Sequence, residues 1–174
     1  MNEELVNESK NGNKEAFTEL ILKYQKDLYR IAKMRLADDY DIDDAIQETM
    51  ITAFKSIKKL KENKYFKTWI IRILINKCNE IYLKKKKESN IIKKYDVTSF
   101  ETNNEMLEIE NKFDFYRLIN ILNYEERISM VLYYVYDYKI KDISEILDTS
   151  ENTIKARLAR GREKIKSKGG IKNG

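Results

Sequence analysis

KIKDISEILDTSENTIKARLARGREKIK, residues 139–166, carries the clearest structural signal in the chain. Apolar residues at three- and four-residue steps predict a short helix over residues 139–147, and Ser150 is a suitable cap for a longer helix reaching about Lys166. The turn between them contains Asp148, one of the few residue types besides Gly that tolerates a left-handed backbone conformation. A short helix, a tight turn and a longer basic helix have the outline of a helix-turn-helix.

The longer helix of this motif has an apolar stripe of Ile154, Leu158 and Ile165, and its remaining faces are polar and basic. A helix in the major groove contacts base edges through residues near its N-terminus and phosphates through flanking cations. The residues expected to contact DNA are Asn152, Thr153, Lys155, Arg157, Arg160 and Arg162. A basic helix alone could equally be a solvated surface, but the short helix and turn before it favour DNA binding.

Residues 13–87 show helical periodicity in three further segments. We expect helices over residues 13–35, about 41–57 and about 65–85, with Asn13 or Asn11 capping the first. The side chains expected to face inward are Phe17, Leu20, Ile21, Tyr24, Leu28, Ile31, Ala32, Ile42, Ala45, Ile46, Met50, Ala53, Phe54, Ile57, Trp69, Ile70, Ile73, Leu74, Cys78 and Ile81. Three such amphipathic helices predict one compact bundle.

Residues 88–110 lose this periodicity and are polar and acidic, which predicts a linker, with a short helix beginning near Glu105. From Asn111 a second body follows, and Asn123 is a suitable cap for the helix that precedes the helix-turn-helix. The sequence therefore predicts an all-α protein of two small helical bundles. The predicted domains are residues 1–87 and 111–174, joined by the linker.

The composition excludes several kinds of chemistry. The 174 residues include no His, which removes the usual general base and metal ligand, and Cys78 is the single cysteine. We therefore expect no disulfide, no metal and no cofactor. No long uncharged apolar stretch is present, and residues 1–10 are too acidic for a signal peptide, so the chain is expected to be cytoplasmic and not itself in the membrane.

An acidic segment occupies residues 38–48, with six carboxylates and no basic residue. Asp41, Asp44 and Glu48 follow one another at three- and four-residue steps, which predicts one exposed helical face suited to a basic partner. The alternative is a magnesium-dependent nuclease. Neither a nearby basic catalytic group nor a Gly-rich phosphate loop accompanies the carboxylates, so docking is the preferred interpretation.

A basic segment follows, with twelve Lys and Arg against two Glu in residues 55–87. Aromatic residues among cations are typical of single-stranded nucleic-acid binding, in which bases stack on rings. The alternative is an ordinary core with a solvated lysine face. Trp69, at helical spacing from Ile73, is expected in the core, whereas Tyr65 and Phe66, at the helix entrance, are the expected base contacts.

These segments, taken in order, resemble an extracytoplasmic-function (ECF) sigma factor of the sigma-70 family, a bacterial RNA polymerase initiation subunit. The resemblance extends from about Leu5 to Lys168. It rests on NGNKEAFTELILKYQKDLYRIA, DIDDAIQETMITAF, FKTWIIRILINKCNEIYLKKK and LNYEERISMVLYYVYDYKIKDISEILDTSENTIKARLARGREKIK. The first three are similar to sigma region 2 and the last to region 4. Departures from the family pattern are Met50 for an aromatic, Glu80 for Asp, Asn123 for Pro, Ser144 for Ala and Asn152 for Gly.

The resemblance implies a function without catalysis: an alternative sigma factor that binds core RNA polymerase and directs promoter-specific initiation. Its partners would be the clamp helices of the largest subunit, the polymerase flap, promoter DNA and an anti-sigma factor. The resemblance assigns docking on the polymerase to Asp41, Asp44, Gln47 and Glu48. It assigns contacts with the melted −10 element to Lys64, Tyr65, Phe66, Lys67, Trp69, Arg72 and Asn76. It assigns contacts with the −35 element to the helix-turn-helix residues given above.

A second function, from a different class, fits the helix-turn-helix taken alone. A stand-alone regulator would bind duplex DNA as a dimer, without polymerase. It would need a dimerisation surface, and it gives no role to the acidic face or to the basic aromatic segment.

Overall fold

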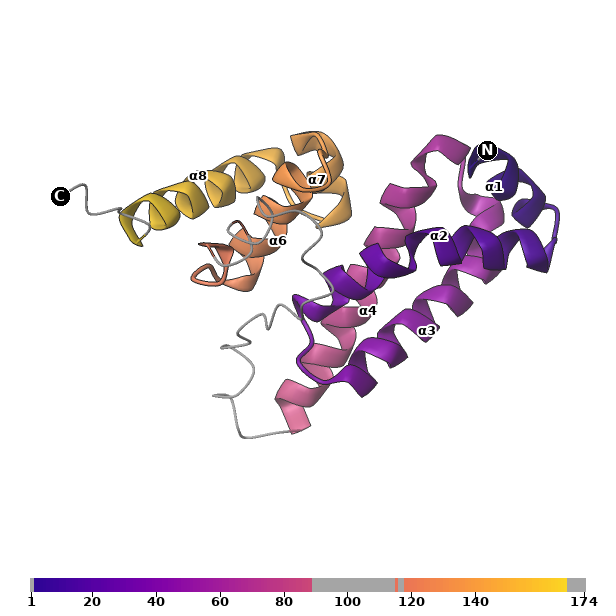
Figure 1. The fold of residues 1–174 in the computed structure, drawn as a ribbon, viewed down its shortest axis with the longest axis horizontal. Coiled ribbons are helices and arrows are strands. Elements are labelled where there is room, and N and C mark those ends of the chain that lie inside the picture. The colour runs from indigo at the N-terminus through magenta and orange to yellow at the C-terminus, as the bar shows by residue number, and fades with distance from the viewer. Residues whose placement is uncertain (1, 89–114, 116–117, 169–174) are drawn as a thin grey trace. The chain divides into compact units, whose positions relative to one another are not determined.

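The structure is a computed structural model that describes residues 2–88, 115 and 118–168. These residues form two compact units built from α-helices, coloured indigo to pink and orange to yellow in Figure 1. Within the described residues there is no β-strand, so the expected all-α class is confirmed. Residues 89–110 of the expected linker, including the helix expected near Glu105, lie outside the described residues. The exact domain boundaries stay a prediction.

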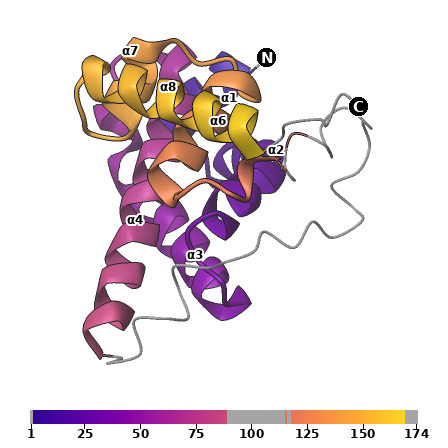
Figure 2. The same cartoon turned by 90° about the vertical axis from the view of Figure 1, so that its left-hand side faces the viewer.

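The described residues of the first unit, 2–88, form four α-helices and two short 3-10 turns. They are α1 (Asn2–Lys10), α2 (Lys14–Lys33), α3 (Asp39–Ser56), η1 (Ile57–Lys59), η2 (Asn63–Tyr65) and α4 (Phe66–Glu88). Figures 1 and 2 show α2, α3 and α4 running side by side, in agreement with the packing of α4 on both other helices. The three expected helices are confirmed, whereas α1, which packs on α2, was not expected.

Polar side chains fix where the helices of this unit begin. Asn13 caps α2 by accepting a hydrogen bond from the Ala16 amide at 3.0 Å. Asp38 caps α3 in the same way, accepting from the Tyr40 amide at 2.8 Å. Each cap satisfies an amide that has no partner within its helix, and the acidic first turn of α3 also complements the helix dipole. Of the two expected caps for α2, Asn13 is therefore the one used.

The face of α4 that packs against the other helices differs from the expected one. Its buried side chains follow strict four-residue steps through Phe66, Ile70, Leu74, Cys78 and Tyr82, with Ile71 and Ile75 beside them. Trp69, Ile73 and Ile81, which were expected inward, are only partly buried. On the facing helices, Tyr24 and Met50 are also partly buried and Phe54 is exposed. The Phe54 ring still meets that of Phe17 in a T-shaped contact, with 5.1 Å between the ring centres.

The second unit contains α6 (Tyr124–Tyr134), α7 (Ile140–Ile146) and α8 (Glu151–Lys168). Asn123 caps α6 by accepting from the Glu126 amide at 2.9 Å, and Ser150 accepts from the Thr153 amide at 3.1 Å. Asp148 has a φ of +47°, so the expected left-handed turn is confirmed. Helices α7 and α8 with this turn form the expected helix-turn-helix.

Helix α8 packs on α6 at Gly161. A Cβ atom at this position would lie 3.2 Å from the Met130 side chain, so the missing side chain allows the close approach of the two helices. Ile154 and Leu158 are buried as expected, but Ile165 is only partly buried because it lies near the end of α8. Most of residues 111–117, where the second body was expected to begin, lie outside the described residues.

Candidate functional site

The acidic face of α3 consists of Asp44, Gln47 and Glu48. All three side chains are exposed, and their spacing places them on one side of the helix. The expectation that Asp41 belongs to this face is wrong. Asp41 is only 7% exposed, and its carboxylate accepts a hydrogen bond from Lys85 of α4 at 2.6 Å. That partner lies 44 residues further along the chain, so local helical spacing could not reveal it.

An apolar groove beside this face was missed by the sequence reasoning. Phe17, Ile21, Leu22 and Leu28 of α2 line it together with Ile46 and Met50 of α3, around a volume of about 220 Å³. Ile46 and Met50 lie within four residues of Gln47, so the groove and the acidic face adjoin along α3. The signal in the sequence was a surplus of apolar residues on α2, where Leu22 is exposed. A groove with a polar rim suits an apolar side chain of a helical partner.

The turn before α4 presents the first candidate contacts with single-stranded DNA. Tyr65 is 46% exposed, which leaves much of its ring open for stacking. The Lys64 ammonium lies 4.9 Å from the centre of that ring and 2.7 Å from the Glu62 carboxylate. The hydrogen bond that the Lys64 ammonium donates to the Glu62 carboxylate raises the pKa of Lys64 above its usual value, which favours the charged form. The turn thus combines an accessible ring with a positive charge.

Phe66, the other expected base contact at the helix entrance, is not on the surface in this structure. Its side chain is 2% exposed, and its ring packs between those of Tyr24 and Trp69, at 5.6 and 5.8 Å. Phe66 is the first residue of the four-residue stripe that anchors α4, so burial there serves the core. Trp69 is partly buried, which leaves part of its ring accessible.

Further candidates continue along the exposed side of α4. Arg72 and Asn76 are exposed, and with Tyr65 and Trp69 they follow four- and three-residue steps along one side of the helix. Lys67 is partly buried and pairs with Asp27 of α2 at 3.1 Å. The structure therefore brings Tyr65, Trp69, Arg72 and Asn76 onto one face and holds Lys67 toward α2.

The exposed side of α8 presents most of the residues expected to contact duplex DNA. Asn152, Lys155, Arg160 and Arg162 are exposed, whereas Thr153 and Arg157 are partly buried. The Thr153 amide donates a hydrogen bond to the Ser150 hydroxyl, which caps the start of α8. The Arg157 guanidinium lies 3.0 Å from the Glu125 carboxylate of α6, so part of its hydrogen-bonding capacity is used within the unit.

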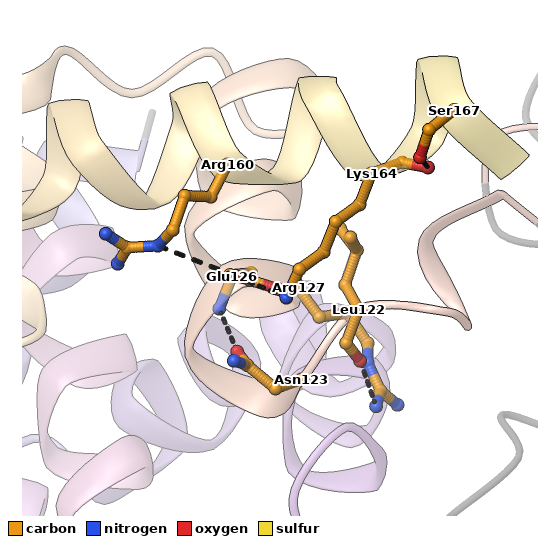
Figure 3. A network of polar contacts seen from close by, with 7 residues as sticks. All are labelled: Leu122, Asn123, Glu126, Arg127, Arg160, Lys164 and Ser167. Atoms are coloured by element: carbon orange, nitrogen blue, oxygen red, sulfur yellow. Dashed lines mark hydrogen bonds and ion pairs between the residues drawn. The ribbon is translucent and has the colours of Figure 1, made fainter.

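A buried carboxylate lies beneath the basic side of α8 (Figure 3). Glu126 of α6 is 2% exposed, and both of its carboxylate oxygens accept from the Lys164 ammonium at 2.8 Å. The Arg160 Nε lies 3.7 Å from the same carboxylate. Because a buried charge is costly unless it is paired, these contacts fix both the docking of α8 on α6 and the direction of the Arg160 side chain.

The described part of the chain contains neither a membrane-spanning helix nor a metal-binding cluster of side chains. None of its helices is long and apolar enough to span a membrane. No group of three or more His, Cys, Asp or Glu side chains is arranged there to hold a metal ion. Two carboxylates of the acidic segment already have other partners, since Asp38 caps α3 and Asp41 pairs with Lys85.

Comparison with protein-family models identifies both units. Residues 20–88 match sigma-70 region 2, and residues 112–165 match sigma-70 region 4, so the matched segments together cover more than half of the chain. The first match falls on the unit with the acidic and the basic aromatic faces, and the second on the unit with the helix-turn-helix. The chain belongs to the sigma-70 family, in its ECF group. Members of this family are transcription initiation factors rather than enzymes.

Individual relatives agree along nearly the whole chain. The ECF RNA polymerase sigma-E factor of Haemophilus influenzae is 29% identical, over 94% of this chain and 93% of the relative. The ECF RNA polymerase sigma factor SigM of Mycobacterium tuberculosis is 26% identical, over 94% and 82%. Among solved structures, the sigma factor RpoE of Bartonella quintana, in complex with the anti-sigma factor NepR, has a TM-score of 0.70 at 20% identity, covering 90% of this chain and 98% of that one. That structural likeness supports the fold.

Proposed function

We propose that this chain acts in the cytoplasm as an alternative sigma factor, binding core RNA polymerase and directing it to specific promoters without catalysing a reaction itself. The observation that carries the proposal is the ordered pair of region 2 and region 4 units. A dimeric regulator would need only the helix-turn-helix. It leaves unexplained a first unit with two functional faces.

Region 2 docks on the polymerase through the acidic face of α3 and the adjoining groove. Asp44 and Glu48 supply negative charge for a basic helix, Gln47 supplies hydrogen bonds, and the groove accepts an apolar side chain of the same partner. The family resemblance assigns this partner to the clamp helices of the largest subunit. Asp41 takes no direct part, since its carboxylate is already paired with Lys85.

The −10 element is bound by the aromatic and basic residues of α4 and of the turn before it. Tyr65 and Trp69 offer rings for unstacked bases, while Lys64 and Arg72 supply charge for the strand, and Asn76 supplies an amide on the same side of α4. Phe66 supports this surface from below by packing against Trp69. Extrusion of a base costs a few kcal/mol, which stacking on an exposed ring can repay.

Region 4 contacts the −35 element through the exposed side of α8. Asn152 and Lys155 lie nearest its N-terminus, where a recognition helix contacts base edges, and Arg160 and Arg162 follow on the exposed side. We include an anti-sigma factor among the partners, because the resemblance implies one and the related RpoE structure is a complex with NepR.

A direct test is binding to core RNA polymerase. The Asp44→Ala, Glu48→Ala double variant should bind about five- to thirtyfold more weakly than the unaltered chain, as removal of charged interface contacts costs about 1–2 kcal/mol. The control is Asp39→Ala, which removes a charge from the first turn of the same helix outside the Asp44–Gln47–Glu48 face. Equal affinity of all three proteins would refute the docking face, and no binding by the unaltered chain would refute the function.

A further inference from the structure

Helix α1 is attached to the turn that presents the −10 contacts. It lies outside the segment matched by the region 2 family model, which begins at residue 20. Its buried Val6 and Ser9 fix it on the first unit, where it packs against α2 and against the η1 and η2 turns. The N-terminal helix therefore reaches a part of the molecule more than fifty residues away in sequence.

Two hydrogen bonds join α1 to the η2 turn through a single side chain. The Asn63 carboxamide oxygen accepts from the Lys10 ammonium at 2.5 Å, and the Asn63 amide group donates to the Glu3 carbonyl at 3.2 Å. Lys10 is the last residue of α1 and Asn63 the first residue of η2. A hydrogen bond to a charged group is among the stronger ones in proteins, and here it is partly buried.

The turn held in this way is the one that carries Lys64 and Tyr65. Its C-terminal end is fixed by the buried Phe66, and its preceding segment by the buried Leu60. Between those anchors, Asn63 sets where the backbone runs immediately before the two exposed residues. A shift of the turn would move the Tyr65 ring and the Lys64 charge together, since the ammonium lies against the ring.

We propose that Lys10 and Asn63 are positioning residues, through which α1 sets the conformation of the η2 turn and thereby the base preference at the −10 element. The inference rests on the proposed function of the turn. It gives α1 a part in promoter selection although α1 itself carries none of the DNA contacts. Recognition of an extruded base needs its binding groups held within about half an ångström of the productive geometry, which loops achieve less well than helices.

The test compares Lys10→Met with a variant of equal charge. Lys14→Met removes one positive charge from an exposed position at the start of α2, and Lys10→Arg retains a donor for Asn63. Each protein is combined with core RNA polymerase on promoters that have a fixed −35 element and a randomised −10 element. Transcripts are sequenced to give the base preference at each position, and thermal unfolding checks that the variants are folded.

We expect Lys10→Met to reduce the preference for the best −10 base by about fivefold or more, since one mismatched base pair normally costs at least that factor. Lys14→Met and Lys10→Arg should keep the profile of the unaltered chain. Asn63→Ala should cause the same loss as Lys10→Met, with little added effect in the double variant. Preference for the −35 element should be unchanged in all of them.

Two results would overturn the inference: an unaltered −10 profile in a folded Lys10→Met protein, or an equal loss in Lys14→Met, which would mark a general effect of charge. Failure of the proposed function looks different. The unaltered chain would then give no polymerase-dependent transcription at any promoter, and the inference would fall with it.

Discussion

The Glu126 carboxylate offers the sharpest test of how α8 is held in place. Glu126→Gln keeps the volume of the side chain and one acceptor oxygen but removes the charge. In the unaltered chain that charge is 2% exposed and bound by Lys164 through both oxygens, with Arg160 nearby. The variant therefore isolates the ionic part of the contact between α6 and α8.

The size of the effect follows from the exposure of the partners. Breaking a fully buried ion pair costs about 3–5 kcal/mol, because the remaining charge has no solvent. The Lys164 side chain is 47% exposed and can regain water, so the loss is nearer that of one hydrogen bond to a charged group. We expect Glu126→Gln to lower the free energy of unfolding of the second unit by about 1.5–3 kcal/mol.

The assay is amide hydrogen exchange across α6 and α8 in increasing urea, because Trp69 lies in the first unit and its fluorescence does not report on the second. Glu163→Gln, an exposed charge on α8, is the matched control and should change the free energy by less than about 0.5 kcal/mol. Combined with Lys164→Met, Glu126→Gln should show a coupling energy of about 1 kcal/mol or more. Additive effects of the two substitutions would refute the reasoning.

Three further predictions concern single side chains. Phe66→Ala should lower the free energy of unfolding of the first unit by about 3–5 kcal/mol in urea denaturation. Tyr65→Ala should change that free energy by less than about 0.5 kcal/mol but should reduce the permanganate reactivity of −10 thymines. The reverse pattern would contradict the assigned roles. Arg160→Ala should weaken binding to a cognate −35 site by about 1–3 kcal/mol, measured by competition, while an equal loss on all sequences would mark a phosphate contact. Burial raises the pKa of Cys78 to about 12, so a thiol reagent at about pH 8 should react far more slowly with the folded protein than with the urea-unfolded chain, and equal rates would contradict the burial.

Features that depend on neighbouring residues were predictable from the sequence. Helix caps act over three residues, so Asn13, Asn123 and Ser150 could be identified by residue type and spacing, and all three accept the expected amide hydrogen bonds. The left-handed Asp148 is likewise a local property of a tight turn. Helical periodicity and the order of the basic and acidic segments were enough to predict two helical bundles and a helix-turn-helix.

Features that depend on distant partners were not predictable in the same way. Helical spacing places Asp41 on an exposed face of α3, but Lys85, near the C-terminal end of α4, donates a hydrogen bond to its carboxylate. Phe66 was assigned to DNA by its position at a helix entrance, although its four-residue spacing from Ile70 and Leu74 indicated the buried stripe. The contact between Lys10 and Asn63 joins two polar residues with no pattern in common, and only the packing of α1 brings them together.

Reconstituted transcription tests the central claim most directly. The unaltered chain and core RNA polymerase are combined on a library in which both the −35 and −10 positions are randomised, with each component omitted in turn. We predict transcripts that require both components and that share two sequence elements, one for each unit. Absence of transcription, together with tight binding of the chain alone to duplex DNA, would contradict the assignment and favour a stand-alone regulator.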